Sequence, residues 1–125
     1  MLVLDSNAVT ELASRTQRAA ARFEVLRQLS GLPIVPSVVL IECLTGEPGR
    51  DARVNQFLKT CAVVEHVPTD VAKAAARLRT LARRGSAVDA LVVALAGPGG
   101  VVVTADLKDI RPLAAHAENV AVEPI

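Results

Sequence analysis

Two short runs of aliphatic residues, one near each end of the chain, are each followed closely by an acidic residue. Residues 2–4 (LVL) precede Asp5, and residues 101–103 (VVV) precede Thr104 and Asp106. Runs this short and this rich in valine are typical of buried strands, which are apolar on both faces when helices cover a parallel sheet. The chain is therefore predicted to contain two buried strands that each deliver a carboxylate near the carboxyl end.

Helices and three further strands are predicted along the rest of the chain. The strands are expected at residues 34–35, 62–67 and 120–122. Helical spacing of apolar residues, bounded by capping residues, Gly and Pro, predicts helices at residues 8–13, 16–30, 38–44, 50–60, 69–84, 87–96 and 107–116. This alternation favours the α/β class, as a three-layer α/β/α sandwich around a mainly parallel five-stranded sheet. Right-handed crossovers favour the strand order 3-2-1-4-5, which makes the first and fourth strands neighbours.

The faces that the longer helices bury can also be predicted from the spacing. In the helix at 16–30, the inward residues are expected to be Ala20, Phe23, Leu26 and Leu29. In the helix at 69–84, they are expected to be Val71, Ala75, Leu78, Leu81 and Ala82. The helix at 87–96 is apolar nearly all round, which marks it as central and covered.

Composition limits the size and kind of protein. At 125 residues the chain is long enough for one compact domain with its own core, so residues 1–125 are read as a single domain. Phe23 and Phe57 are the only aromatic residues, which predicts an aliphatic core and leaves few side chains on which nucleic-acid bases could stack. Cys43 and Cys61 are too few for a disulfide framework and are expected to be reduced.

The sequence shows no targeting or membrane signal. Its N-terminus lacks a basic region and is interrupted by Asp5, unlike a signal peptide. The longest uncharged run, residues 90–105, is broken by GPGG at 97–100 and falls short of the ~18 apolar residues that a spanning helix needs. We therefore expect a cytoplasmic protein without a membrane span.

The predicted strand order brings acidic residues together. In open parallel sheets, ligands bind outside the carboxyl ends of the strands where the strand order reverses, which is where Asp5 and Asp106 are expected. Glu42 is a further candidate, because it interrupts the apolar residues 38–44 with no Lys or Arg within one helical turn. An isolated buried carboxylate is costly unless it is paired or binds a metal. Glu42 can equally face water from the narrow polar edge of its helix.

Two other aspartates lie at predicted helix starts. Ser86 and Asp89 have the spacing of a capping box, and Asp106 and Asp109 are three residues apart at the start of the next helix. Carboxylates are favoured at such positions by the free N–H groups and the dipole of the helix. Each of these acids can therefore be a cap rather than a site residue.

Taken together, Asp5, Glu42, Asp89 and Asp106 indicate a metal site. Clustered carboxylates repel one another and are tolerated near neutral pH mainly when divalent cations lie among them. Oxygen ligands without His or Cys favour Mg²⁺ or Mn²⁺ over zinc, and such ions can activate a water for attack on a phosphodiester. If these acids and Asp109 are set aside, eight acids face fourteen bases and the net charge changes from +1 to +6. An Arg-rich surface around a cluster of acids would suit a metal site that faces phosphates. An ordinary mixed surface would give the same net charge.

Four segments, in order, resemble the acidic motifs of PIN-domain nucleases. They are residues 2–7 (LVLDSN), 37–42 (SVVLIE), 87–96 (AVDALVVALA) and 102–109 (VVTADLKD). The resemblance covers the whole chain. Its size and N-terminal first strand are most similar to the VapC-like ribonuclease toxins of bacterial VapBC-type toxin–antitoxin modules.

This resemblance implies a metal-dependent endoribonuclease that hydrolyses RNA with Mg²⁺ or Mn²⁺. The residues implied as metal ligands and catalytic groups are Asp5, Glu42, Asp89 and Asp106. Asp109 is a possible ligand beside or in place of Asp106, and Ser6 and Thr104 are implied to support the site. The resemblance also implies an RNA substrate, a homodimer and a cognate antitoxin protein that neutralises the toxin.

Four arginines of the predicted helix at 69–84 could hold an RNA backbone by charge. They are Arg77, Arg79, Arg83 and Arg84. For any single one of them, a solvated helix face is the better explanation.

Two other functions stay open at this point. A phosphatase of the haloacid dehalogenase type would use Asp5 as its nucleophile, but that chemistry normally needs a second acid where this chain has Asn7. A non-catalytic PIN-like binding module would have acids that are only caps and surface charges. It would lack the stabilisation by divalent cations that a preformed acidic site predicts.

Overall fold

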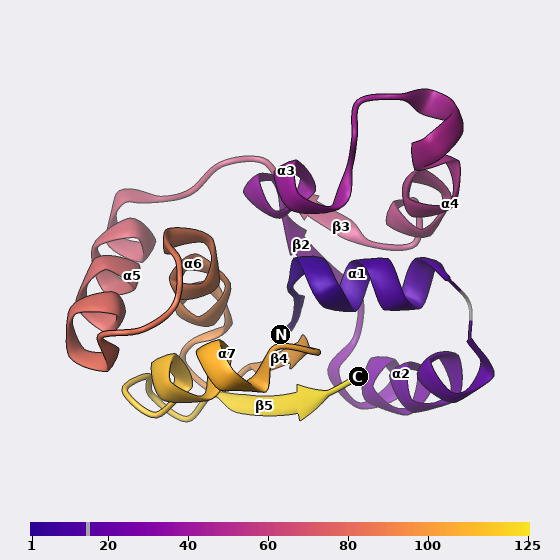
Figure 1. Ribbon diagram of the computed structural model, residues 1–125. Helices are drawn as coiled ribbons and strands as arrows, with labels where there is room; N and C mark the ends of the chain where they lie inside the picture. Colours follow the sequence, from indigo (N-terminus) through magenta and orange to yellow (C-terminus); the bar gives the residue numbers. More distant parts are fainter. Residues whose placement is uncertain (15) are drawn as a thin grey trace.

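A parallel sheet forms the centre of the molecule (Figure 1). The computed structural model describes residues 1–14 and 16–125, and its five strands lie in the order β3-β2-β1-β4-β5. The strands are β1 (Leu2–Leu4), β2 (Pro33–Pro36), β3 (Ala62–Val64), β4 (Val101–Thr104) and β5 (Ala121–Pro124). All four neighbouring pairs are parallel. The predicted class and strand order are confirmed.

Helices flank the sheet on both sides (Figure 1). They are α1 (Ser6–Ala13), α2 (Gln17–Ser30), α3 (Leu40–Cys43), α4 (Pro48–Leu58), α5 (Thr69–Ala82), α6 (Ala87–Ala96) and α7 (Leu107–Ala114), with a 3₁₀ turn, η1 (Ser37–Val39), before α3. Helices α1 and α6 both contact the central strands β1 and β4, and α5 packs on α6. Within the described residues, no helix combines the length and the apolar character needed to cross a membrane.

The two central strands end together at one edge of the sheet. Leu2 is paired with Val101, and Leu4 with Val103. The backbone N–H of Asp5 then donates a hydrogen bond to the carbonyl of Val103 at 3.3 Å. This register brings Asp5 and Thr104 to the same edge, because each follows directly after the last of these pairs.

The core is aliphatic, as the composition predicts. All three residues of β1 are fully buried, and α6 and α7 add fully buried residues to the same cluster. Burial of each such Val or Leu side chain contributes roughly 1.5–3 kcal/mol. Phe23 and Phe57 meet edge to face with ring centroids 6.0 Å apart. Cys43 and Cys61 are free thiols, half-buried at the edge of the core.

Two helices bury a narrower face than their sequences predict. In α2, Ala19 and Phe23 are buried while Leu29 is 79% exposed. In α5, Ala75 is buried while Leu81 is 46% exposed. Each exposed leucine lies six residues beyond a buried residue, which places it roughly 120° around the helix axis. The predicted inward stripes were therefore too wide, and Ala20 is also exposed.

Most element boundaries differ from the prediction by one or two residues, and three differences have a clear cause. Helix α5 ends at Ala82 because Arg83 adopts a left-handed conformation with φ of 52°. Strand β3 ends at Val64 because its partner β2 ends at Pro36, so the following residues have no strand to pair with. The single helix expected at 38–44 is instead η1 followed by α3.

Candidate metal centre

Asp5 lies where β1 ends and α1 begins, and it is 4% exposed. Its Oδ1 accepts a hydrogen bond from the backbone N–H of Ala8 at 3.0 Å, which makes Asp5 the N-cap of α1. Its Oδ2 accepts a hydrogen bond from the hydroxyl of Thr104. The carboxylate is thus fixed through both oxygens, and each oxygen keeps a second lone pair that a ligand could use.

The pKa of Asp5 is raised above its ordinary value of 3.8, chiefly because burial disfavours the charged form. The hydrogen bonds from Thr104 and Ala8 act in the opposite direction. The negative charges of Asp89 and Asp106 then raise the pKa further. Asp5 therefore lies in the electrostatic field of the aspartates that begin the last two helices.

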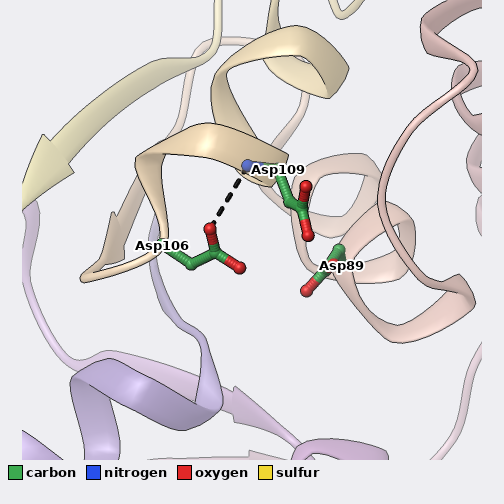
Figure 2. Close-up of side chains that lie close together, drawn as sticks. All are labelled: Asp89, Asp106 and Asp109. Carbon is green, nitrogen blue, oxygen red and sulfur yellow. Dashed lines mark hydrogen bonds between the residues drawn. The ribbon is translucent and has the colours of Figure 1, made fainter.

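Three aspartates gather beside this position (Figure 2). One carboxylate oxygen from each of Asp89, Asp106 and Asp109 lies within 4.8 Å of those from the other two. Asp89 comes from α6, while Asp106 and Asp109 come from the start of α7. We call these three residues the aspartate group. Asp5 is not a member by this distance, although its pKa responds to two of the three.

Each member of the aspartate group is positioned by its helix start. Asp89 Oδ2 accepts a hydrogen bond from the Ser86 N–H at 2.9 Å, and the Asp89 N–H donates to Ser86 Oγ at 3.1 Å. Asp106 Oδ1 accepts from the Asp109 N–H at 3.3 Å. The capping role that the sequence allows is therefore present. It holds the acids near one another, so capping and metal binding are compatible.

Thr104 connects Asp5 to the aspartate group. Thr104 is fully buried, and its hydroxyl donates to Asp5 while accepting a hydrogen bond from the Asp106 N–H at 2.8 Å. One side chain at the end of β4 thus sets the position of two acids that are about a hundred residues apart in sequence. Ser6, the other predicted supporting residue, is half-buried as the first residue of α1.

Glu42 is placed differently from the aspartates. It lies on the short helix α3 with an exposed side chain, and it does not belong to the aspartate group. Its exposure agrees with the alternative that Glu42 faces water. A role for Glu42 as a metal ligand stays a prediction.

The arginines predicted to bind RNA lie on α5 and the turn that follows it. Arg77, Arg79 and Arg83 are exposed. Arg84 Nε donates to Asp109 Oδ1 at 3.0 Å, so this arginine pairs directly with the aspartate group. The sequence offered no signal for this pair, because the two residues are 25 positions apart.

Asp51 is a buried acid that the sequence did not single out. It is 5% exposed, and it accepts hydrogen bonds from the Thr45 N–H at 2.9 Å, the Thr45 hydroxyl at 2.8 Å and the Gly46 N–H at 2.8 Å. These bonds, led by that from the Thr45 N–H, hold the pKa of Asp51 below its ordinary value. Asp51 therefore fastens the loop between α3 and α4 to the start of α4.

The donor set of the site fits a hard divalent cation. Every candidate ligand is a carboxylate oxygen, with no His or Cys in the aspartate group. Within the described part of the chain, Asp5, Asp89 and Asp106 form no ion pair, and Asp109 is paired with Arg84. A buried acid with a raised pKa beside two further acids is an arrangement that a cation would stabilise.

The chain was compared with known proteins. No protein-family model and no curated protein sequence matches it. Solved structures do match, over nearly the full length of both chains. VapBC2 from Rickettsia felis, bound to a DNA fragment from its promoter, has a TM-score of 0.76 at 15% identity and covers 99% of this chain and 98% of that chain.

Two further structures give the same result. A toxin–antitoxin complex from Klebsiella pneumoniae has a TM-score of 0.70 at 18% identity, covering 97% of this chain and 96% of that chain. FitAcB from Neisseria gonorrhoeae has a TM-score of 0.66 at 18% identity, covering 98% and 96%. At such identities the likeness concerns the fold. Over its full length, the chain has the PIN-like fold of these solved structures, with a five-stranded parallel sheet in the order 3-2-1-4-5.

Proposed function

We propose that this protein is a metal-dependent endoribonuclease. The observation that carries the proposal is that the aspartate group lies at the carboxyl end of β1 and β4, where Thr104 joins it to the buried Asp5. A structural sheet edge has no need of four neighbouring acids, whereas a site for hard cations does. The same arrangement explains why a buried carboxylate is kept where its charge is costly.

Asp5, Asp89, Asp106 and Glu42 of α3 would hold Mg²⁺ or Mn²⁺, with Asp109 beside or in place of Asp106. Bound there, such a cation supplies positive charge that lowers the pKa of a water and stabilises the phosphodiester during hydrolysis. In the proposed reaction, the water oxygen forms a bond to phosphorus and the bond from phosphorus to a ribose oxygen breaks.

The chain's own residues do the positioning. Thr104 and the Ala8 N–H hold the Asp5 carboxylate in one orientation, so little reorganisation is needed when charge develops. The capping box of α6 holds Asp89 in the same way. The first turns of α6 and α7 also place positive dipole ends beside the aspartates, which reduces the repulsion between them.

We further propose that the protein acts as the toxin of a toxin–antitoxin pair. The Klebsiella pneumoniae structure that the fold resembles is a toxin–antitoxin complex, and VapBC2 of Rickettsia felis was solved bound to promoter DNA. By this likeness, the chain would have a cognate antitoxin as its partner and would form a homodimer in the cell interior. Growth arrest on expression, relieved by co-expression of a small protein encoded beside it, would test this part of the proposal.

The nuclease proposal is tested by incubating the purified protein with a pool of single-stranded RNA and mapping the new RNA ends. Cleavage is expected with Mn²⁺ or Mg²⁺ and should stop in EDTA. Asp5→Asn should abolish it while the protein stays folded, whereas Asp70→Asn, the same change at an exposed site on α5, should leave it intact. Cation-dependent cleavage by the Asp5→Asn protein, or hydrolysis of small phosphomonoesters without RNA cleavage, would overturn the proposal.

A further inference from the structure

A hollow of about 520 Å³ lies at the C-terminal end of α5 and is lined by arginines. Its lining residues are Ala76, Arg79, Thr80, Arg83, Arg84 and Gly85. We call it the arginine hollow. Among the described residues, no acid lines it, so three arginines border this volume without a carboxylate among them.

The turn after α5 carries two of the lining arginines, Arg83 and Arg84. Arg83 ends the helix in a left-handed conformation, and Gly85 follows with φ of 84°. A Cβ atom on Gly85 would lie 2.7 Å from Leu113 Cδ1, so this turn packs tightly against α7. The turn leads from α5 to Ser86, the first residue of the α6 capping box.

The arginine hollow lies directly beside the aspartate group. Arg84 lines the hollow and also donates its Nε–H to Asp109 Oδ1 at 3.0 Å. A guanidinium has four further N–H donors on its two terminal nitrogens, and these can serve a second anion. Within the described residues, Arg79 and Arg83 have no carboxylate within ion-pair distance, so their charge is free to meet a ligand.

We infer that the arginine hollow binds the sugar–phosphate backbone of the RNA strand next to the phosphodiester at the aspartate group. This inference rests on the proposed nuclease function and adds a substrate subsite to it. Arginine clusters recognise phosphate oxygens through charge and paired N–H donors. Neither aromatic residue of the chain lines the hollow, so the contact is to phosphates rather than to stacked bases. Arg84 would link the two sites by contacting Asp109 on one side and phosphate on the other.

The test measures RNA affinity as a function of salt. Asp5→Asn protein serves as the uncleaving parent, and a fluorescein-labelled single-stranded RNA is titrated by anisotropy over a series of KCl concentrations. The double variant Arg79→Gln/Arg83→Gln is compared with Arg50→Gln/Arg53→Gln, which removes the same charge from exposed positions on α4.

Each phosphate contact on a single strand contributes about 0.7 to the slope of log K against log salt. Loss of two contacts should lower the slope by about 1.4, which at physiological salt weakens binding on the order of tenfold. The control on α4 should keep the slope of the parent. An unchanged slope in the Arg79→Gln/Arg83→Gln protein would overturn the inference. The inference would also be overturned if the parent protein bound polyglutamate as tightly as RNA and the Arg79→Gln/Arg83→Gln protein lost that binding.

The inference and the nuclease proposal fail in different ways. One outcome is that the unsubstituted protein cleaves RNA with Mn²⁺ while Arg79→Gln/Arg83→Gln changes neither the salt slope nor the RNA concentration needed for half-maximal cleavage. In that case the arginine hollow is not a substrate subsite, and the nuclease proposal stands. If no RNA is cleaved under any condition, the nuclease proposal fails and the assigned role of the hollow in substrate binding fails with it.

Discussion

Replacement of Thr104 by Val removes the hydroxyl that joins Asp5 to the start of α7. Valine has nearly the same shape, so the change tests the two hydrogen bonds rather than packing. Loss of the donor leaves one oxygen of a buried carboxylate without its partner, which costs roughly 1–3 kcal/mol or more for a charged group. The half-buried Asp106 N–H loses its acceptor as well, which adds about 1 kcal/mol.

The metal-free Thr104→Val protein is therefore expected to lose about 2–4 kcal/mol of stability at neutral pH. For a chain of this length, this corresponds to a fall in Tm on the order of 10 °C. Thermal unfolding in EDTA, followed by circular dichroism, measures it. Thr104→Ser keeps both hydrogen bonds and should lose far less, and Thr10→Val, at an exposed helical threonine, should change Tm little.

The pH dependence makes this prediction specific to Asp5. Because the hydrogen bond from Thr104 lowers the pKa of Asp5, its loss raises that pKa further above the ordinary value. A raised carboxyl pKa favours the folded state at low pH, and this advantage is lost as the pH rises through the folded pKa. The penalty of Thr104→Val should thus be smallest in acid and grow as the pH rises. A penalty that is independent of pH, or equal in Thr104→Ser, would refute the proposed role of the hydroxyl.

Three other variants test the charges around the site and the loop before α4. Asp5→Asn should raise the Tm of the metal-free protein at neutral pH, because it removes a buried charge that two neighbouring acids repel. The gain in Tm should vanish in acid, where Asp5 is protonated, and thermal melts across a pH series would measure it. Arg84→Gln should tighten Mn²⁺ binding up to about fivefold, because Asp109 loses its exposed ion pair with Arg84. Calorimetric titration would measure the affinity, and weaker binding would contradict the prediction. Asp51→Asn should lower Tm at neutral pH, and the difference should shrink as the pH falls below 3.8, because the pKa of Asp51 is lowered and its stabilisation needs the charged form.

Most of the fold could be predicted from local sequence signals. The valine-rich runs identify β1 and β4, and their place among alternating helices fixes the parallel sheet and its order. Helix faces were predicted less well, since Leu29 and Leu81 are apolar but exposed. Periodicity reports which side chains are apolar, and it does not report how wide a face the neighbouring elements cover.

The site could be predicted only where the topology determines it. The meeting of Asp5 with Asp106 follows from neighbouring strand ends, and the structure places the charge of Asp106 within the field of Asp5. The pair between Arg84 and Asp109 depends on the turn after α5, whose left-handed Arg83 gives no clear signal in sequence. The buried Asp51 escaped notice because its partners are five and six residues away, outside any local capping pattern.

The central claim, that the acids form a site for divalent cations, is tested most directly by thermal unfolding with and without Mn²⁺. A cation bound only by the folded state at about 100 times its Kd adds about 2.7 kcal/mol, a rise in Tm on the order of 10 °C. Such a rise is expected for the unmodified protein, and it should be lost in Asp106→Asn. A Tm that Mn²⁺ leaves unchanged at millimolar concentration, or that rises equally in Asp106→Asn, would contradict it.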